Sequence, residues 1–234
     1  MAEPDVAATD VRRVTELIEL GRDREAAELA EAQAGPFHPD HAEFPGGPMD
    51  VLGQLGELGP LLAGIVGAIS PDQLDQPTPC SQFTVRGVLG HMIGGAAVFA
   101  AAFRGVEPSM PDTTDVLGGF GPALGGLVEA IHAPGALDST VHAPFGDVPG
   151  ATFARFVVLD GLVHGWDLAT ATGQSYAPPD ALVAEVESFA RETLAPLRDG
   201  DTFAEPVEAP ASATPIERLA AFTGRHVRPV HVIR

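Results

Sequence analysis

The stretch VVLDGLVHGWDLATATG, residues 157–173, decides the fold of this chain. It predicts a helix from about 151 to 172, because Gly173 follows it as the usual left-handed terminator. Asp160 and His164 stand four apart in this helix, and positions i and i+4 lie on the same face, one turn apart. Their surroundings are apolar, where an unpaired charge would be costly, so both side chains need partners.

Capping and breaking signals on either side of this stretch predict further helices. Thr84 can cap a helix, and Ser70-Pro71-Asp72-Gln73 and Thr214-Pro215-Ile216-Glu217 are capping boxes. The sequence shows no internal repeat and no alternation of strands and helices, so we expect an all-α fold with four main helices. The expected helices cover about 50–69, 85–104, 115–133, 151–172, 180–197 and 215–224, with extended structure and a turn over 137–149.

The composition excludes several classes of protein. The chain has 234 residues, with 32 acidic residues against 13 basic ones, all arginine, and a net charge of −19. This acidity argues against nucleic acid and anionic membranes as partners. The apolar run 87–103 is too short to span a bilayer and predicts a buried helix of a soluble protein. With one cysteine, Cys80, and no signal peptide near Met1, we expect a cytoplasmic protein without disulfides.

The first 48 residues differ from the rest in composition. They carry 11 acids and 4 arginines and predict a helical extension, from Thr9 to about Ala34, and then a linker rich in proline and glycine. His38 and His41 lie in this linker, where a solvated loop is favoured over a metal site. The chain therefore divides into an extension, 1–48, and a helical bundle, 49–234.

A third polar side chain can complete the group on the 151–172 helix. His91 is alone among polar residues in the run 87–103. Together, His91, Asp160 and His164 could bind zinc or another divalent metal and leave one coordination position open, as catalytic sites do. The alternative is a hydrogen-bonded Asp160–His164 pair inside the core, with His91 satisfied elsewhere.

Glycines cluster around both histidines. Each glycine inside a helix costs about 0.5–1 kcal/mol relative to alanine, so their presence implies close helix approach or room for a ligand. A compositional origin stays open, because the chain has 27 glycines. The glycines concerned are Gly87, Gly90, Gly94 and Gly95 around His91, and Gly161 and Gly165 around His164.

Several motifs resemble those of one protein family, the actinobacterial metal-binding proteins of the DinB-like superfamily, whose better-known relatives are the mycothiol-dependent maleylpyruvate isomerases. The resemblance covers about 49–228. It rests on Pro77-Thr78-Pro79-Cys80, Phe83-Thr84-Val85-Arg86, Leu89-Gly90-His91, the stretches 133–150 and 160–174, Thr214-Pro215-Ile216-Glu217-Arg218-Leu219 and Phe222-Thr223-Gly224-Arg225.

The resemblance implies a DinB-like four-helix bundle, here with extra C-terminal helices. It also implies a divalent metal held by a histidine on the second helix and an acid-x3-histidine pair on the fourth, which are His91, Asp160 and His164. The isomerases have Glu where this chain has Asp160, and they carry a further domain that supplies an arginine. Since the chain ends at Arg234, activity on maleylpyruvate itself is not expected.

The leading functional hypothesis is a metal-dependent transferase or isomerase that uses a mycothiol-type thiol and a small electrophilic substrate. Zinc is favoured as the metal over nickel, iron or manganese. The alternatives are a metal-dependent hydrolase, a non-catalytic metal- or partner-binding bundle, and a metal-free scaffold.

Other residues near the expected centre are candidates for supporting roles. Asp167, three positions after His164, is a candidate for contact with a ligand or substrate, with a surface acid as the alternative. Trp166 is expected to pack. Arg225 belongs to a basic C-terminal cluster that is expected to pair with this protein's own acids, with attraction of a carboxylate substrate as the alternative. Cys80 is expected to be a small buried residue rather than a nucleophile.

Overall fold

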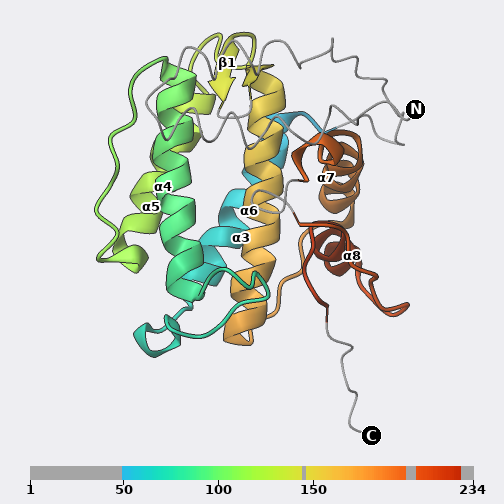
Figure 1. Ribbon diagram of the computed structural model, residues 1–234. Coiled ribbons are helices and arrows are strands. Elements are labelled where there is room, and N and C mark those ends of the chain that lie inside the picture. The colour runs from blue at the N-terminus through green and yellow to red at the C-terminus, as the bar shows by residue number, and fades with distance from the viewer. Residues whose placement is uncertain (1–48, 144–145, 199–203, 228–234) are drawn as a thin grey trace, which may run out of the picture.

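The computed structural model describes residues 49–143, 146–198 and 204–227, so the predicted extension 1–48, with His38 and His41, lies outside the described residues. Within these ranges the chain is mainly helical, with one short hairpin (Figure 1). The elements are α3 (Val51–Gly67), η1 (Pro71–Gln73), α4 (Val85–Arg104), α5 (Val116–Ile131), β1 (Thr140–Ala143), β2 (Gly146–Pro149), α6 (Gly150–Thr172), α7 (Asp180–Thr193), η2 (Ala195–Leu197) and α8 (Pro215–Phe222).

Four helices form the bundle. Helix α3 packs against α6 and α5, and α4 packs against α5 and α6, so each helix contacts two others. Helices α7 and α8 lie beside α6 on the outside of the bundle, and the hairpin lies at the end where α6 begins (Figure 1). The expected all-α fold with additional C-terminal helices is confirmed.

Local capping explains where the two most important helices begin and end. The Thr84 hydroxyl accepts a hydrogen bond from the backbone N–H of Gly87, which starts α4 at Val85 as predicted. Helix α6 ends at Thr172, where Gly173 adopts the left-handed conformation with φ of 71°.

The predicted helix from Asp180 to Leu197 is too long. Helix α7 ends at Thr193, and the chain continues as the separate turn η2. Pro196 has no N–H to donate back to the preceding turn and disfavours helical geometry at the residue before it, so the α-helix stops before reaching it.

The expected extended segment 137–149 forms an antiparallel hairpin. Val141 of β1 pairs with Val148 of β2, and the Val141 side chain is buried between the hairpin and the helices. The hairpin leads directly into α6, and the Gly150 N–H donates to the carbonyl of Ser139.

Close helix contact explains the two α6 glycines. A Cβ at Gly161 would lie 2.8 Å from Leu58 Cδ2, and one at Gly165 would lie 2.9 Å from Leu62 Cδ2 and 2.6 Å from the Tyr176 hydroxyl. Both glycines therefore let leucine side chains of α3, and at Gly165 also Tyr176, pack directly against the backbone of α6. The expectation of close approach is met on α6.

Helix α4 alone, among the described residues, is long and apolar enough to cross a membrane. Half of its most apolar window is buried inside the bundle, where it packs between α5 and α6. Its apolar character is that of a core helix, as the sequence predicted.

Candidate metal centre

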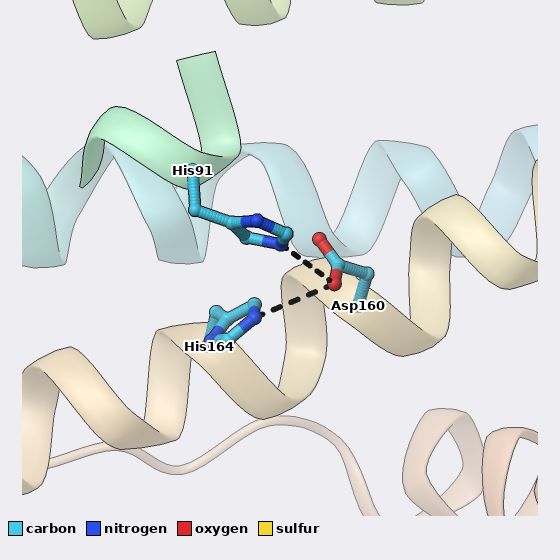
Figure 2. Close-up of side chains that lie close together, drawn as sticks. All are labelled: His91, Asp160 and His164. Carbon is cyan, nitrogen blue, oxygen red and sulfur yellow. Dashed lines mark ion pairs between the residues drawn. The ribbon is translucent and has the colours of Figure 1, made fainter. Parts of the chain in front are cut away.

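Three side chains converge where α4 crosses α6. His91 extends from the second turn of α4 toward Asp160 and His164, which stand one turn apart on α6 (Figure 2). His91 Nε2 lies 3.5 Å from Asp160 Oδ1, and His164 Nε2 lies 3.4 Å from the same oxygen. One ligand atom from each residue lies within 4.8 Å of the other two. The structure thus brings together the three residues that the sequence predicted.

The donor set and its spacing fit a divalent metal. Two imidazoles and a carboxylate are common ligands of zinc and of other first-row metals. Bonds of about 2.0–2.2 Å in a tetrahedral site put neighbouring ligand atoms about 3.3–3.6 Å apart. Both N–O distances fall in that range and exceed the ~2.7–3.2 Å usual for an N–H···O hydrogen bond. The geometry suits shared coordination better than a direct hydrogen bond.

The three side chains differ in exposure. His164 is buried, with 6% of its side chain exposed, whereas His91 is 41% and Asp160 33% exposed. A small molecule can therefore approach the centre from the side of His91 and Asp160, while His164 forms its inner wall.

The charges of the centre stabilise one another. The Asp160 carboxylate, close to the ring nitrogen and negatively charged, raises the pKa of His91, although burial opposes the shift. Burial by itself raises the pKa of Asp160, but His164, His91 and Arg225 outweigh it and hold that pKa below its ordinary value. Asp160 is consequently an ionised carboxylate at neutral pH, the form that binds a metal.

Asp167 orients the His164 ring through a hydrogen bond to its Nδ1 nitrogen. Its side chain is fully buried, and its Oδ2 accepts a hydrogen bond from His164 Nδ1 at 3.0 Å. Because Nδ1 carries the proton in this arrangement, Nε2 is free to bind a metal on the opposite side of the ring. The interpretation of Asp167 as a surface acid is wrong, since the last turns of α6 are covered by α8 and the segment after it.

Arg225 balances the buried charge of Asp167. Its Nη2 and Nε lie 3.1 and 3.4 Å from Asp167 Oδ2, and 11% of its side chain is exposed. The other carboxylate oxygen, Asp167 Oδ1, is buried without a hydrogen-bond partner. The sequence grouped Arg225 with a C-terminal basic cluster expected to pair with internal acids, and Arg225 does so.

Phe83 covers one side of the centre. Its ring stacks on His91 at a centroid distance of 5.4 Å and meets His164 edge-on at 6.5 Å. No sequence signal indicated this role, because Phe83 lies in the turn before α4. An aromatic ring there limits the rotation of both imidazoles and excludes water from that side.

Cys80 belongs to the same turn but is a poor nucleophile. It is partly buried, and this burial raises the pKa of its thiol more than the nearby Arg225 lowers it. A thiol with a raised pKa has little thiolate at neutral pH. Trp166 is buried among the apolar residues of the core, as expected.

Comparison with known proteins agrees with the motifs. The profile of the mycothiol maleylpyruvate isomerase N-terminal domain matches residues 55–169. Two uncharacterized proteins of Mycobacterium tuberculosis, from strains CDC 1551 and H37Rv, are each 36% identical over 171 residues, which is 71% of this chain and 93% of theirs. The chain belongs to the family of the mycothiol maleylpyruvate isomerase N-terminal domain. Its bundle is therefore a DinB-like helical fold related to mycothiol-dependent proteins.

The matched region contains every residue of the centre on α4 and α6. His91, Asp160, His164 and Asp167 all lie within residues 55–169, whereas Arg225 lies outside them. The arginine that completes the buried ion pair is thus contributed by a C-terminal segment outside the residues that the profile matches. No solved structure matches the chain significantly.

Proposed function

We propose that this protein is a divalent-metal-dependent enzyme that uses a low-molecular-weight thiol of the mycothiol type. It acts as a transferase or isomerase on a small electrophilic compound. The observation that carries the proposal is the convergence of His91, Asp160 and His164, at separations suited to metal ligands, on a side of the bundle that solvent reaches. Membership of the mycothiol-related family supports the thiol.

Each residue of the centre has a distinct role in this proposal. His91, Asp160 and His164 would hold the metal, and a bound metal would keep a thiol in its thiolate form at neutral pH. Asp167 keeps the His164 ring in one tautomer and orientation, and Arg225 offsets the negative charge of Asp167. Phe83 shields the imidazoles on one side.

The chemistry requires no oxidant. The thiol proton passes to solvent, and a sulfur electron pair forms a bond to the electrophilic carbon. In a transfer reaction, the leaving group departs with the electrons of the bond that breaks. In an isomerisation, the attack breaks a carbon–carbon π bond of the substrate and moves its electrons onto a conjugated electron-withdrawing group. After rotation about the resulting single bond, these electrons re-form the π bond, and the carbon–sulfur bond breaks with its electrons returning to sulfur.

Zinc is the metal we favour, and nickel, iron and manganese accept the same ligands. The proposed partners are the thiol and a small substrate. Nucleic acid and anionic membranes are not expected, given the charge of −19. The cytoplasm is the proposed location, since low-molecular-weight thiols are kept reduced there.

Metal analysis tests the first half of the proposal. Protein purified without chelator or a nickel column is expected to contain about one equivalent of a divalent metal, and His91→Ala or His164→Ala should lose it. His132→Ala is the matched control, because His132 is exposed and its ring bonds only the carbonyl of Val128. A native protein that neither contains nor binds metal would overturn the proposal.

A thiol titration tests the second half. Adding mycothiol, or cysteine as a simpler probe, to the cobalt-substituted protein is expected to produce a sulfur-to-cobalt absorption band that saturates. An unchanged cobalt spectrum would eliminate the thiol mechanism and leave a hydrolase or a non-catalytic metal protein.

A further inference from the structure

An apolar cavity opens beside Asp160, inside the bundle. It has a volume of about 40 Å³, is partly open, and is lined by residues of α3, α4, α5 and α6. Its wall includes Leu62, Met92, Phe99, Phe120, Leu127 and Val157. Because Asp160 also belongs to the candidate metal centre, the cavity and the centre share a wall.

The lining has almost no means of holding a charged or polar group. Asp160 is the one ionisable residue among the residues that line the cavity, and none of them carries a positive charge. A carboxylate placed there would lose its hydration without gaining a partner and would be repelled by Asp160. Water is also poorly held, since a buried water needs about two to four polar partners.

A glycine on α4 keeps part of this space open. Gly95 lies one turn beyond His91 and lines the cavity. A Cβ at Gly95 would meet only Phe99 Cε2, at 3.8 Å, so no close contact requires glycine at this position. This differs from Gly161 and Gly165 on α6, where a Cβ would collide with α3 or Tyr176.

We propose that this cavity holds the apolar end of the substrate. The electrophile is then a small compound with a short hydrocarbon group near its reacting carbon, and not a dicarboxylate. The inference rests on the proposed function, because it places the reacting carbon next to Asp160 and the metal. A cavity of this size accepts a group of a few carbon atoms, each of which gains affinity as it leaves water.

A series of hydroxamates tests this inference by binding alone. A hydroxamate anchors on the metal, and its tail can enter the cavity. With zinc-loaded protein, calorimetry is expected to show binding that tightens about fourfold for each methylene from acetohydroxamate to butyrohydroxamate. The hydroxamate of succinic acid, whose tail ends in a carboxylate, is expected to bind no tighter than acetohydroxamate.

Two glycine variants separate the cavity from general effects on the helices. Gly95→Leu fills the cavity and should remove the dependence on chain length while acetohydroxamate still binds. Gly64→Leu on α3 is the matched control, because Gly64 is exposed, does not line the cavity and has nothing within 4 Å of an added Cβ. It should retain the full dependence.

Xenon provides a second measurement that needs no metal. Dry apolar cavities bind xenon, so we expect xenon to shift the methyl resonances of Leu127 and Val157 in the wild-type protein and not in Gly95→Leu.

The inference is overturned if chain length has no effect in the wild-type protein, if the acidic tail binds as tightly as butyrohydroxamate, or if xenon shifts neither methyl group. These results differ from a failure of the proposed thiol chemistry. If the thiol chemistry failed, adding a thiol would leave the cobalt spectrum unchanged, while hydroxamate affinity would still depend on tail length.

Discussion

Asp167 shows how much one side chain depends on its surroundings. Its spacing from His164 placed it near the face of the centre, but spacing alone did not distinguish a buried carboxylate from a surface acid. In the structure it has no exposed surface and lies between His164 and Arg225. Its buried negative charge is stabilised by these two neighbours, and it aligns the histidine in return.

Replacing Asp167 by asparagine is expected to weaken metal binding about 10- to 100-fold, the usual effect of losing a carboxylate behind a metal-bound histidine. Asparagine has nearly the same shape, but it is uncharged and can present an N–H to His164 Nδ1, which favours the wrong tautomer. Competition with a chromogenic chelator measures the affinity.

The hairpin offers a matched control for that change. Asp147 also accepts a hydrogen bond from a histidine, His142, but both side chains are largely exposed and lie outside the centre. Asp147→Asn should leave metal affinity unchanged. Equal affinities in wild type and Asp167→Asn would show that Asp167 has only a structural role.

Nearby residues set the limits of the helices, whereas packing against other segments sets the junction between β2 and α6. Thr84 sets the start of α4 through a hydrogen bond, and Gly173 sets the end of α6 through its left-handed backbone conformation. Both effects act within a few residues, so the sequence predicted these two helix limits well. The junction between β2 and α6 is different, because Gly150 packs directly against the turn that precedes the hairpin.

Gly150→Ala is expected to destabilise the protein by about 1–3 kcal/mol, although alanine is the better helix former. Its Cβ would collide with the carbonyl oxygen of Ala136, a backbone atom that cannot rotate away. Urea unfolding followed by circular dichroism measures the change.

Gly64→Ala is the comparison for this effect. It lies in α3, is exposed and has free space around an added Cβ, so alanine should stabilise the protein by about 0.5–1 kcal/mol. If both variants proved equally stabilising, the close packing at Gly150 would not constrain α6.

For the whole molecule, a bound metal is expected to stabilise the fold by linking two helices. Its ligands come from α4 and α6, so binding requires the folded bundle, and a ligand that binds only the folded state stabilises it. At free metal about 100-fold above Kd, the gain is about 2.7 kcal/mol, or about 5–10 °C in Tm for a chain of this size.

Chelator dialysis is therefore expected to lower Tm by that amount, and re-addition of zinc should restore it. In differential scanning calorimetry, His91→Ala should show no response to zinc, whereas His132→Ala should respond like the wild type. An identical Tm with and without metal in the wild-type protein would argue against coordination across α4 and α6.

The sequence by itself determined the fold class, the limits of most helices and the pairing of Asp160 with His164, because caps, glycine terminators and the i, i+4 spacing act within a turn or two of helix. Only the tertiary structure decided that His91 meets this pair, that Arg225 reaches Asp167 and that an apolar cavity adjoins the centre. The two side-chain contacts join residues far apart in the sequence: His91 lies 69 positions before Asp160, and Arg225 lies 58 positions after Asp167. Their geometry depends on how closely four packed helices approach one another, which no local pattern specifies.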